Sequence, residues 1–510
     1  MERNLTPMGK QSFLQGTLIL SGAALITRAL GFISSIFLAR MLGAEGIGLL
    51  MMAQPLIPLI ITLTELGLPV AISKFVAEAE VRQDHAKTKR ILVISLLVTS
   101  TLSITLTLIS LLGSEYIASF LLADQRAYYA MVALTPIAPI IAVSAVLKGY
   151  FRGKQQMKTI AISDICENIA NICTILLLVE WLLPYGIEYA AAGAMAAAVV
   201  SEATSLTILS IRFRMERARL PKTITIREVL AKGKSTLFEL LRIGLPTTGQ
   251  GFIHSLYGAV QPLLVAYSLS LAGLMTAEAT AQFGLLTGYA LPLLFLPSFV
   301  THSLSTALIP AISEAHAQRD NLLMHRTIEQ AMRIALLVGA PSTIILFEWA
   351  SPLATLIYDA PEAGRLIKIL APFFFLFYFE APLHAILLGL GRASTAMWNF
   401  IISIICRTAA IFLLGSRLGI EGVALGIGMG MLVMMMLNFF SVSKAVGFYM
   451  ELRPYVATGV CMPLMGICGQ HAYAYLQGVG LTLLPSVLLS ILLALACYFA
   501  AWMGMRVWRA

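Results

Sequence analysis

The sequence predicts an all-α, polytopic membrane protein with about 14 transmembrane helices, in two six-helix parallel-repeat lobes plus two C-terminal helices. Composition, the length of the apolar runs and an internal repeat predict this class. Of the 510 residues, 58% are hydrophobic and only 12% are charged, so little of the surface can face water. A helix needs roughly 20 apolar residues to cross about 30 Å of hydrocarbon, and it pairs its own backbone amides in lipid.

The apolar runs follow one another along the whole chain. The first run begins after a short basic tail, is long for a signal peptide and leads straight into further runs, so we expect it to be retained. We place the fourteen spans, to within several residues, at 13–39, 46–77, 90–112, 127–151, 159–183, 189–211, 237–268, 279–312, 328–358, 364–389, 394–416, 420–443, 453–476 and 481–506.

The basic residues predict the orientation of these spans. The net charge is +9, and 27 of the 35 Lys and Arg residues fall in the tails and connections on one side of the predicted membrane, against 5 on the other. By the positive-inside rule the richer side is cytoplasmic, so both termini are expected in the cytoplasm. Because the charges are explained by topology, the composition does not indicate a nucleic-acid partner.

A weak internal repeat pairs the second predicted span with the eighth, the fifth with the eleventh and the sixth with the twelfth. The repeating unit is therefore six helices, and because six is even the two copies have the same orientation. The matches are residues 71–73 with 311–313 and 163–167 with 403–407, both at a separation of 240, and 186–188 with 419–421 at a separation of 233.

The repeat divides the chain into an N-lobe (1–211), a basic linker (212–236), a C-lobe (237–450) and a final pair of spans (451–510). The linker carries eight positive charges, which could bind anionic lipid headgroups at about 1 kcal/mol each. The alternative is that these charges only set the topology.

Prolines interrupt the second and eighth spans at similar places. Such matched interruptions are the best sequence indication of a transporter's binding site. Proline removes an amide donor and bends a helix, which frees carbonyls that need water or a ligand, so we expect these spans to line a wet cavity. Kinks that only help the bundle to pack are the alternative. The prolines are Pro55, Pro58, Pro69, Pro292, Pro297 and Pro310.

Ionisable residues at membrane depth are the candidate substrate-binding residues. Arg28 lies deep in the first span, where an unpaired charge costs at least about 2.5–3.5 kcal/mol. Arg28 either binds an anionic headgroup or forms an ion pair with Glu65. Glu167 and Arg407 could form a latch between the lobes, contact substrate or be hydrated charges. His254 is either a hydrogen-bonding core residue or a proton carrier.

Four stretches in this order resemble the polysaccharide-transporter branch of the multidrug/oligosaccharidyl-lipid/polysaccharide (MOP) flippase superfamily, which includes the lipid II flippases. They are LITRALGFISSIFLARMLGAEGIGLL (25–50), ELGLPVAISKFVAEAE (65–80), LKGYFRGKQQMKTIAISDICENIANI (147–172) and PSFVTHSLSTALIPAISEAHA (297–317).

The resemblance implies a non-enzymatic flippase of the bacterial cell membrane in peptidoglycan or spore-cortex synthesis. Two lobes would rock about a central cavity, whose arginines hold the diphosphate of an undecaprenyl-linked glycan, and the last two helices would form a groove for the lipid tail. Arg28 matches the family arginine in the motif (S/T)R-x-LGF. Lipid II flippases have further arginines where this chain has Ser34 and Pro292. These departures leave open a related glycan carrier, with Arg407 supplying the missing charge.

Three other functions remain open at this point. A drug or cation antiporter would need an acidic cavity, which Glu65, Glu202 and Glu380 could supply. A membrane glycosyltransferase or polymerase would need large external loops with catalytic groups, and the predicted outer connections are short. A scaffold without transport is the third. No cofactor is expected, and transport could be coupled to an ion gradient or to the membrane potential. The sequence does not indicate an oligomeric state.

Overall fold

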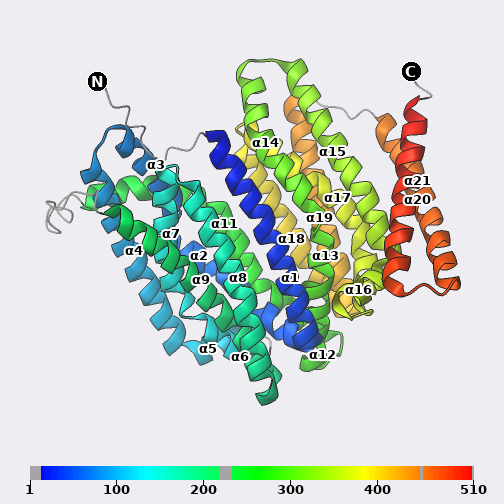
Figure 1. Ribbon diagram of the computed structural model, residues 1–510, viewed down its shortest axis with the longest axis horizontal. Helices are drawn as coiled ribbons and strands as arrows, with labels where there is room; N and C mark the ends of the chain where they lie inside the picture. Colours follow the sequence, from blue (N-terminus) through cyan, green and yellow to red (C-terminus); the bar gives the residue numbers. More distant parts are fainter. Residues whose placement is uncertain (1–12, 123, 218–232, 448–451, 508–510) are drawn as a thin grey trace, which may run out of the picture. The chain divides into compact units, whose positions relative to one another are not determined.

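The computed structural model describes residues 13–122, 124–217, 233–447 and 452–507 (Figure 1). Within these ranges the chain is helical with no β-strand, which confirms the all-α fold. The chain divides into two compact units, residues 1–263 and 264–510. The predicted lobe boundaries stay predictions, and the centre of the basic linker, residues 218–232, lies outside the described residues.

Unit 1 holds the first set of helices. They are α1 (Phe13–Ala53), α2 (Leu56–Glu65), α3 (Leu68–Val81), α4 (His85–Leu112), α5 (Ser114–Leu121), the 3₁₀ turn η1 (Gln125–Ala127), α6 (Tyr128–Leu134), α7 (Ile137–Gly153), α8 (Met157–Leu182), the 3₁₀ turn η2 (Leu183–Tyr185), α9 (Ile187–Arg217) and most of α11 (Gly233–Leu271).

Unit 2 begins inside α11 and holds the remaining elements. They are α12 (Thr276–Gly284), the π-helical segment η3 (Leu285–Ala290), α13 (Leu291–Phe295), α14 (Ser298–Ala317), α15 (Asn321–Glu348), α16 (Ala350–Tyr358), α17 (Ala363–Gly389), α18 (Ala393–Leu418), α19 (Ile420–Val446), α20 (Leu452–Gly478) and α21 (Leu483–Val507).

Ten stretches of the described chain are helical and apolar enough to cross a membrane, and two bent helix pairs raise this number to 12. One of the ten is 44 residues long and merges the first predicted span with part of the second. Gly43, with a φ of 63° and a ψ of −177°, interrupts the helix there. The predicted thirteenth span, α20, is not among the 12. A multi-pass membrane protein is therefore confirmed, and the count of 14 is consistent with the structure. The orientation of the termini stays a prediction.

The six-helix repeat is visible in the helix bounds. Both ends of α4 and α15 are 236 positions apart, and so are both ends of α8 and α18. After α8 the three-residue turn η2 has no counterpart, so α9 and α19 begin 233 positions apart. The contacts repeat as well, because α7 packs against α3, α4 and α9 in unit 1 and α17 packs against α14, α15 and α19 in unit 2.

Helix caps support the same separation. Asp84 caps α4 by accepting a hydrogen bond from the Lys87 amide at 2.8 Å. Asp320, 236 positions later, caps α15 by accepting one from the Leu323 amide at 2.9 Å. An N-cap carboxylate satisfies an amide that the first turn leaves without an intrahelical partner, so each aspartate determines where its helix begins.

The register predicted at a separation of 240 is therefore wrong by one helical turn. A shift of four residues keeps the same helix face pointing inwards, which is why the sequence match was convincing. At the observed separation Glu167 corresponds to Ser403, and Arg407 corresponds to Asn171. The third match is confirmed, since its glycines, Gly186 and Gly419, both have positive φ and directly precede α9 and α19.

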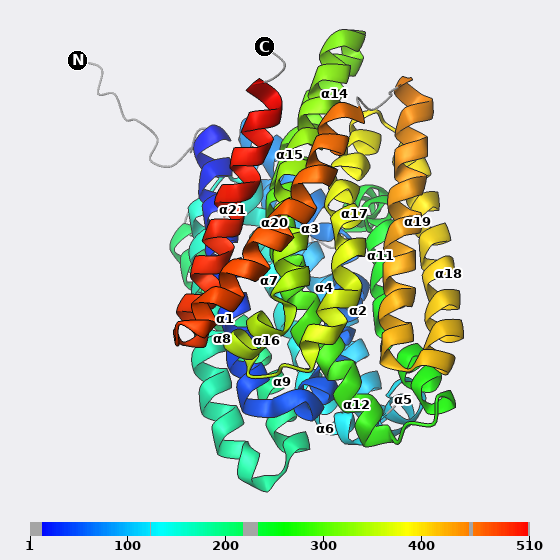
Figure 2. The same cartoon turned by 90° about the vertical axis from the view of Figure 1, so that its right-hand side faces the viewer.

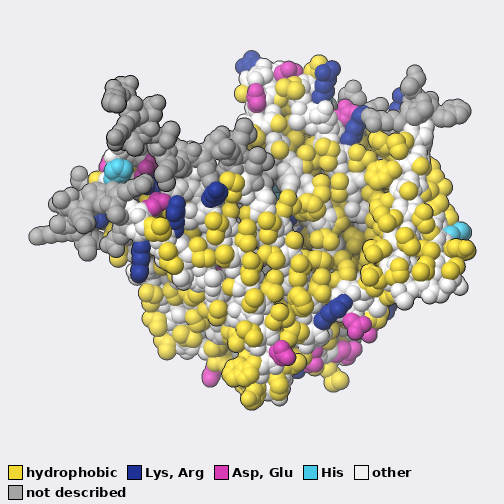
Figure 3. All heavy atoms as spheres, viewed as in Figure 1, with side chains coloured by type: hydrophobic (Ala, Val, Ile, Leu, Met, Phe, Trp, Pro, Cys, Tyr) yellow, Lys and Arg dark blue, Asp and Glu magenta, His cyan; other side chains and the backbone are white. Residues whose placement is uncertain are grey.

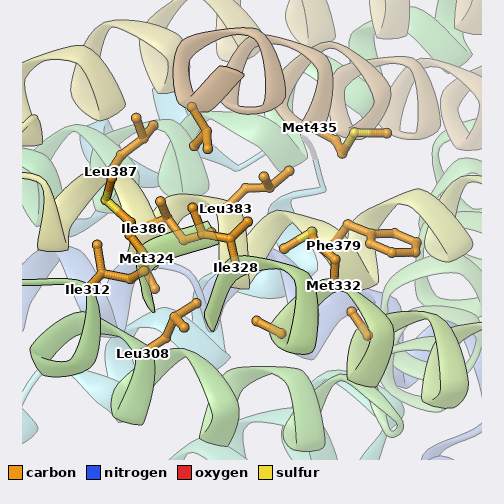
Figure 4. Close-up of a cluster of buried hydrophobic side chains, with 14 of the residues drawn as sticks. Leu308, Ile312, Met324, Ile328, Met332, Phe379, Leu383, Ile386, Leu387 and Met435 are labelled. Carbon is orange, nitrogen blue, oxygen red and sulfur yellow. The ribbon is translucent and has the colours of Figure 1, made fainter. Parts of the chain in front are cut away.

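The hydrophobic cores of the two units are built from equivalent helices of the repeat. In unit 2 the core joins α14, α15, α17 and α19, as the labelled side chains of Figure 4 show. In unit 1 buried hydrophobic residues occupy equivalent positions, 236 residues earlier. Ile72 corresponds to Leu308, and Leu147 corresponds to Leu383. Since lipid tails are as apolar as these side chains, close van der Waals packing rather than burial from water holds such helices together.

Two equivalent glycines allow close helix contacts. A Cβ atom on Gly153 of α7 would lie 2.7 Å from the carbonyl oxygen of Ser73 on α3. A Cβ atom on Gly389 of α17 would lie 2.9 Å from the carbonyl oxygen of Ile309 on α14. Both distances are shorter than carbon and oxygen atoms tolerate, so these positions admit only glycine at the present helix spacing.

The predicted interruptions of the second and eighth spans occur. In unit 1, Leu66 and Gly67 have positive φ between α2 and α3, and Pro69 follows in the first turn of α3. In unit 2 the segments before and after Leu296–Pro297 are bent by 58°. Of the remaining prolines, Pro55 precedes α2, Pro58 lies in its first turn, Pro292 lies in the first turn of α13 and Pro310 lies inside α14. Their role in lining a cavity stays a prediction.

The last two helices form a hairpin on unit 2. Figure 2 shows α20 and α21 side by side, and α20 packs against α15. The buried indole of Trp349 donates a hydrogen bond to Ser490 Oγ at 2.9 Å and so ties the hairpin to the start of α16. Figure 3 shows hydrophobic side chains over the visible face of this hairpin, as expected for a surface in contact with lipid.

Candidate functional site

Charged side chains of unit 1 gather around Lys148. Its Nζ atom lies 3.0 Å from Asp164 Oδ1 and 3.5 Å from Glu167 Oε2. Lys148 is near the end of α7, and both carboxylates come from the adjacent helix α8. The three side chains are between 24% and 34% exposed, so water or a ligand can reach them although they lie within helical spans.

Two more carboxylates belong to this group. Glu65, the last residue of α2, is within electrostatic range of Lys148 and of Glu202 on α9. Lys148 is in turn within range of Glu202. We call Glu65, Lys148, Asp164, Glu167 and Glu202 the unit 1 polar layer. Four helices supply it, and its acids outnumber the single lysine four to one.

Helix α1 runs beside α8 in the same direction. Beyond the interruption at Gly43, a Cβ atom on Gly46 of α1 would lie 2.9 Å from Ile187, the first residue of α9, which follows α8 after the turn η2. Before the interruption, Ser34 Oγ donates a hydrogen bond to Asn171 Oδ1 at 3.4 Å. This hydrogen bond sets the register of the first part of α1 against α8.

This register places Arg28 at the level of the polar layer. Arg28 precedes Ser34 by six residues. The position six residues before Asn171 on α8 is 165, which lies between Asp164 and Glu167. Because both helices rise about 1.5 Å per residue, Arg28 lies at the same depth as these two carboxylates.

The guanidinium of Arg28 is exposed. Neither an ion pair nor a hydrogen bond joins it to another residue of the described chain, and the predicted alternative, a pair with Glu65, is not formed there. Glu65 interacts instead with Lys148 and Arg152. An exposed guanidinium in an apolar helix needs water or an anion, so the headgroup-binding hypothesis for Arg28 stands while its role stays a prediction.

Polar side chains continue along one face of α8. They recur at intervals of three or four residues, the spacing of one helix face, over about 10 Å of helix. Asn171 donates a hydrogen bond to Ser201 Oγ on α9 at 3.3 Å, which fixes the end of the row. We call this row, Asp164, Glu167, Asn168 and Asn171, the α8 polar stripe.

Unit 2 carries a different polar cluster at the equivalent helices. Asn399 of α18 donates to Asn438 Oδ1 of α19 at 2.9 Å and to Ser441 Oγ at 3.0 Å. Asn438 donates in turn to Glu380 Oε1 of α17 at 3.3 Å. Both asparagines are buried. This chain of amides joins three helices through hydrogen bonds rather than through ion pairs.

Arg407 lies beside this cluster. It is half-buried on α18, within electrostatic range of Glu380, and packs closely against Gly430 of α19. Glu167 and Arg407 thus have charged neighbours within their own units, and the latch between them stays a prediction. His254 is exposed on α11, and its role also stays a prediction.

Several residues of these clusters were not predicted as site residues. Lys148 looked like part of the cytoplasmic connection because it lies close to the end of its span. Asp164 lies in the stretch 147–172, and its helical spacing from Glu167 and Asn171 could have indicated a polar helix face. Asn399 and Asn438 carry no charge, so they did not stand out among the apolar residues around them.

Comparison with known proteins decides the family. The model described as polysaccharide biosynthesis protein matches residues 13–316, and the MatE model matches residues 262–413. Stage V sporulation protein B of Bacillus subtilis (strain 168) is 45% identical over 476 residues, which cover 92% of this chain and 91% of that protein. The chain belongs to the polysaccharide biosynthesis protein family. The predicted place in the polysaccharide-transporter branch of the MOP superfamily is confirmed.

The chain is also similar to other members of the superfamily. Lipid II flippase MurJ of the same organism is 22% identical, over 85% of this chain and 83% of that protein. A solved structure of lipid II flippase MurJ in an inward closed conformation has a TM-score of 0.72 at 15% identity and covers 95% of this chain and 98% of the other. An inward-facing MATE family transporter has a TM-score of 0.69 at 18% identity and covers 85% and 98%.

The two structural likenesses show a shared fold. These relatives are named as flippases and transporters rather than as enzymes, and the glycosyltransferase alternative finds no support among them.

Proposed function

We propose that the protein is an alternating-access flippase for an undecaprenyl-diphosphate-linked glycan in peptidoglycan or spore-cortex synthesis. Two relatives with sporulation in their names support the setting, at 45% and 30% identity. A third relative named as a lipid II flippase supports the class of substrate. A glycan head is too polar for hydrocarbon, so such a protein has to offer polar side chains at membrane depth, as unit 1 does.

Arg28 is the observation that carries this proposal. Its guanidinium is exposed at the depth of the polar layer, and no acid of the described chain pairs with it. A planar guanidinium binds phosphate oxygens through two parallel hydrogen bonds, which makes arginine a favoured partner for a diphosphate. A binding role also explains why the chain keeps a charge that is costly to place in a membrane helix.

The membrane potential can drive this transport in the required direction. A diphosphate is anionic, and the cytoplasm is negative relative to the outside. Moving each negative charge outwards releases about 2.3 kcal/mol per 100 mV. An ion gradient is therefore not required for the headgroup itself, although coupling to one stays an alternative.

A cation antiporter is the second candidate function. The MatE match over residues 262–413 and the carboxylate of Glu380 in unit 2, which accepts a hydrogen bond from Asn438, support it. In unit 1, however, the lysine ammonium already occupies the space between Asp164 and Glu167. The acids there are engaged by a cation that belongs to the chain, which favours the flippase.

Reconstitution in liposomes tests the proposal. Fluorescent undecaprenyl-diphosphate glycans of several kinds are inserted, and their exposure on the opposite face is followed with and without an imposed potential. The flippase predicts faster exposure than in empty vesicles, with a further increase when the potential favours outward movement of anions. Unchanged rates for every glycan would favour a scaffold, and export of cationic drugs in their place would favour the antiporter.

A further inference from the structure

The α8 polar stripe is a special feature of unit 1. At the observed separation of 236, its four positions correspond on α18 to Phe400, Ser403, Ile404 and Arg407, which include neither a carboxylate nor an amide. Both α8 and α18 nevertheless pack closely against their following helices, α9 and α19. The fold therefore does not need a polar stripe at this place, and the stripe calls for another explanation.

Two buried serines lie close to these charged residues along α7 and α9. Ser205 of α9 is fully buried beside the carboxylate of Glu167. The Ser205 hydroxyl is positioned to donate to that carboxylate. Ser144 is buried one turn before Lys148 on α7, and its Oγ atom has no hydrogen-bond partner among the described residues. A buried hydroxyl without a partner costs about 1–3 kcal/mol, so a polar ligand that reaches Ser144 would bind more favourably.

The chemistry of the stripe fits the hydroxyl groups of a sugar. Ionised carboxylates accept hydrogen bonds, lysine donates them, and asparagine does both, so together these groups match a ring of hydroxyls that each donate and accept. The carboxylates of the stripe are poor partners for a phosphate, which the guanidinium of Arg28 suits better. A metal cation would have to displace the Lys148 ammonium from Asp164 and Glu167.

We propose that the α8 polar stripe, with Lys148, binds the first sugar residues of the lipid-linked glycan. This inference rests on the proposed function and adds a second subsite to it. Arg28 lies level with Asp164 and Glu167, so a diphosphate held by Arg28 places the attached sugar beside the stripe. The stripe extends about 10 Å towards Asn171, which gives a short oligosaccharide hydrogen-bonding partners along its length.

The test compares two probes in the same liposomes. One is a fluorescent undecaprenyl-diphosphate glycan, and the other is fluorescent undecaprenyl diphosphate without sugar. For each variant the rate of transport of the glycan probe is divided by the rate for the probe without sugar. The variants are Asp164→Asn and Glu167→Gln, with Asn168→Ala as a milder change of the same stripe in case a charge substitution prevents folding. Cys173→Ser is the matched control, because it is exposed on α8 about half a turn of angle from Asp164.

We expect the ratio to fall about tenfold in Asp164→Asn and Glu167→Gln, since each loses a charge-assisted hydrogen bond to a hydroxyl. Asn168→Ala should shift it in the same direction, and Cys173→Ser should leave it unchanged. An unchanged ratio in the stripe variants, or a sodium requirement that these variants remove, would overturn the sugar subsite alone. Transport of neither probe by the unmodified protein would instead overturn the proposed function and the subsite with it.

Discussion

Lys148 of α7 and Asp164 of α8 form an ion pair with 3.0 Å between Nζ and Oδ1. The pair places a cation of the chain inside a group of acids and joins two helices of unit 1 at the depth of Arg28. Stability, the binding site and the choice between flippase and antiporter all depend on it.

Removing the lysine should destabilise unit 1. Lys148→Met leaves Asp164 and Glu167 without their counter-charge, and because the side chains are partly exposed we expect a loss of about 1–3 kcal/mol rather than the larger cost of a dry ion pair. Thermal unfolding in detergent measures it. Asp164→Asn in the Lys148→Met background should recover part of the loss. Additive losses in the double variant would show that the two residues do not interact.

The glycine contacts predict a sharp sensitivity to one added methyl group. Gly153→Ala and Gly389→Ala should each lower stability by about 1–3 kcal/mol, because the new Cβ atom collides with a backbone carbonyl that cannot rotate away. Gly251→Ala on α11 is the control, since a Cβ atom there meets nothing within 4 Å. It should be neutral or stabilising, because alanine favours helices over glycine. Equal effects at all three positions would contradict the close approach.

The amide chain of unit 2 should behave as one cooperative group. Asn399→Leu leaves Asn438 with an unsatisfied buried oxygen, and we expect a cost of about 1–3 kcal/mol. Asn438→Leu should cost a similar amount. The double variant should cost clearly less than the sum, because residues that share hydrogen bonds are not independent. A double-mutant cycle by thermal unfolding measures the coupling, and a coupling energy of zero would argue against the hydrogen bond between them.

Much of the architecture could be predicted from sequence. The apolar runs gave the helical class and the approximate spans, and the repeat gave the six-helix unit. The register of the repeat could not be read from apolar tripeptides, because residues 71–73 and 311–313 match equally well when shifted by one turn of helix. Asp84 and Asp320, each at the start of a helix, were the better markers, since a cap has one position only.

The candidate site was predicted in part. Arg28, Glu65 and Glu167 were found because charges are rare in apolar spans, and the structure places all three in unit 1 at or near one polar layer. Lys148 escaped because a lysine near a span end looks like a topology signal. The partners of each charge depend on how helices pack side by side, and spacing along a single helix does not determine that.

The most direct test of the account is the effect of Arg28→Gln on the exposure of a fluorescent undecaprenyl-diphosphate glycan in liposomes. Arg417→Gln, an exposed arginine in the last turn of α18, serves as the matched control. The account predicts that Arg28→Gln folds normally, because its guanidinium has no partner in the described chain, and that it loses the acceleration over empty vesicles while Arg417→Gln keeps it. A folded Arg28→Gln protein that exposes the glycan as fast as the unmodified protein would contradict the central claim.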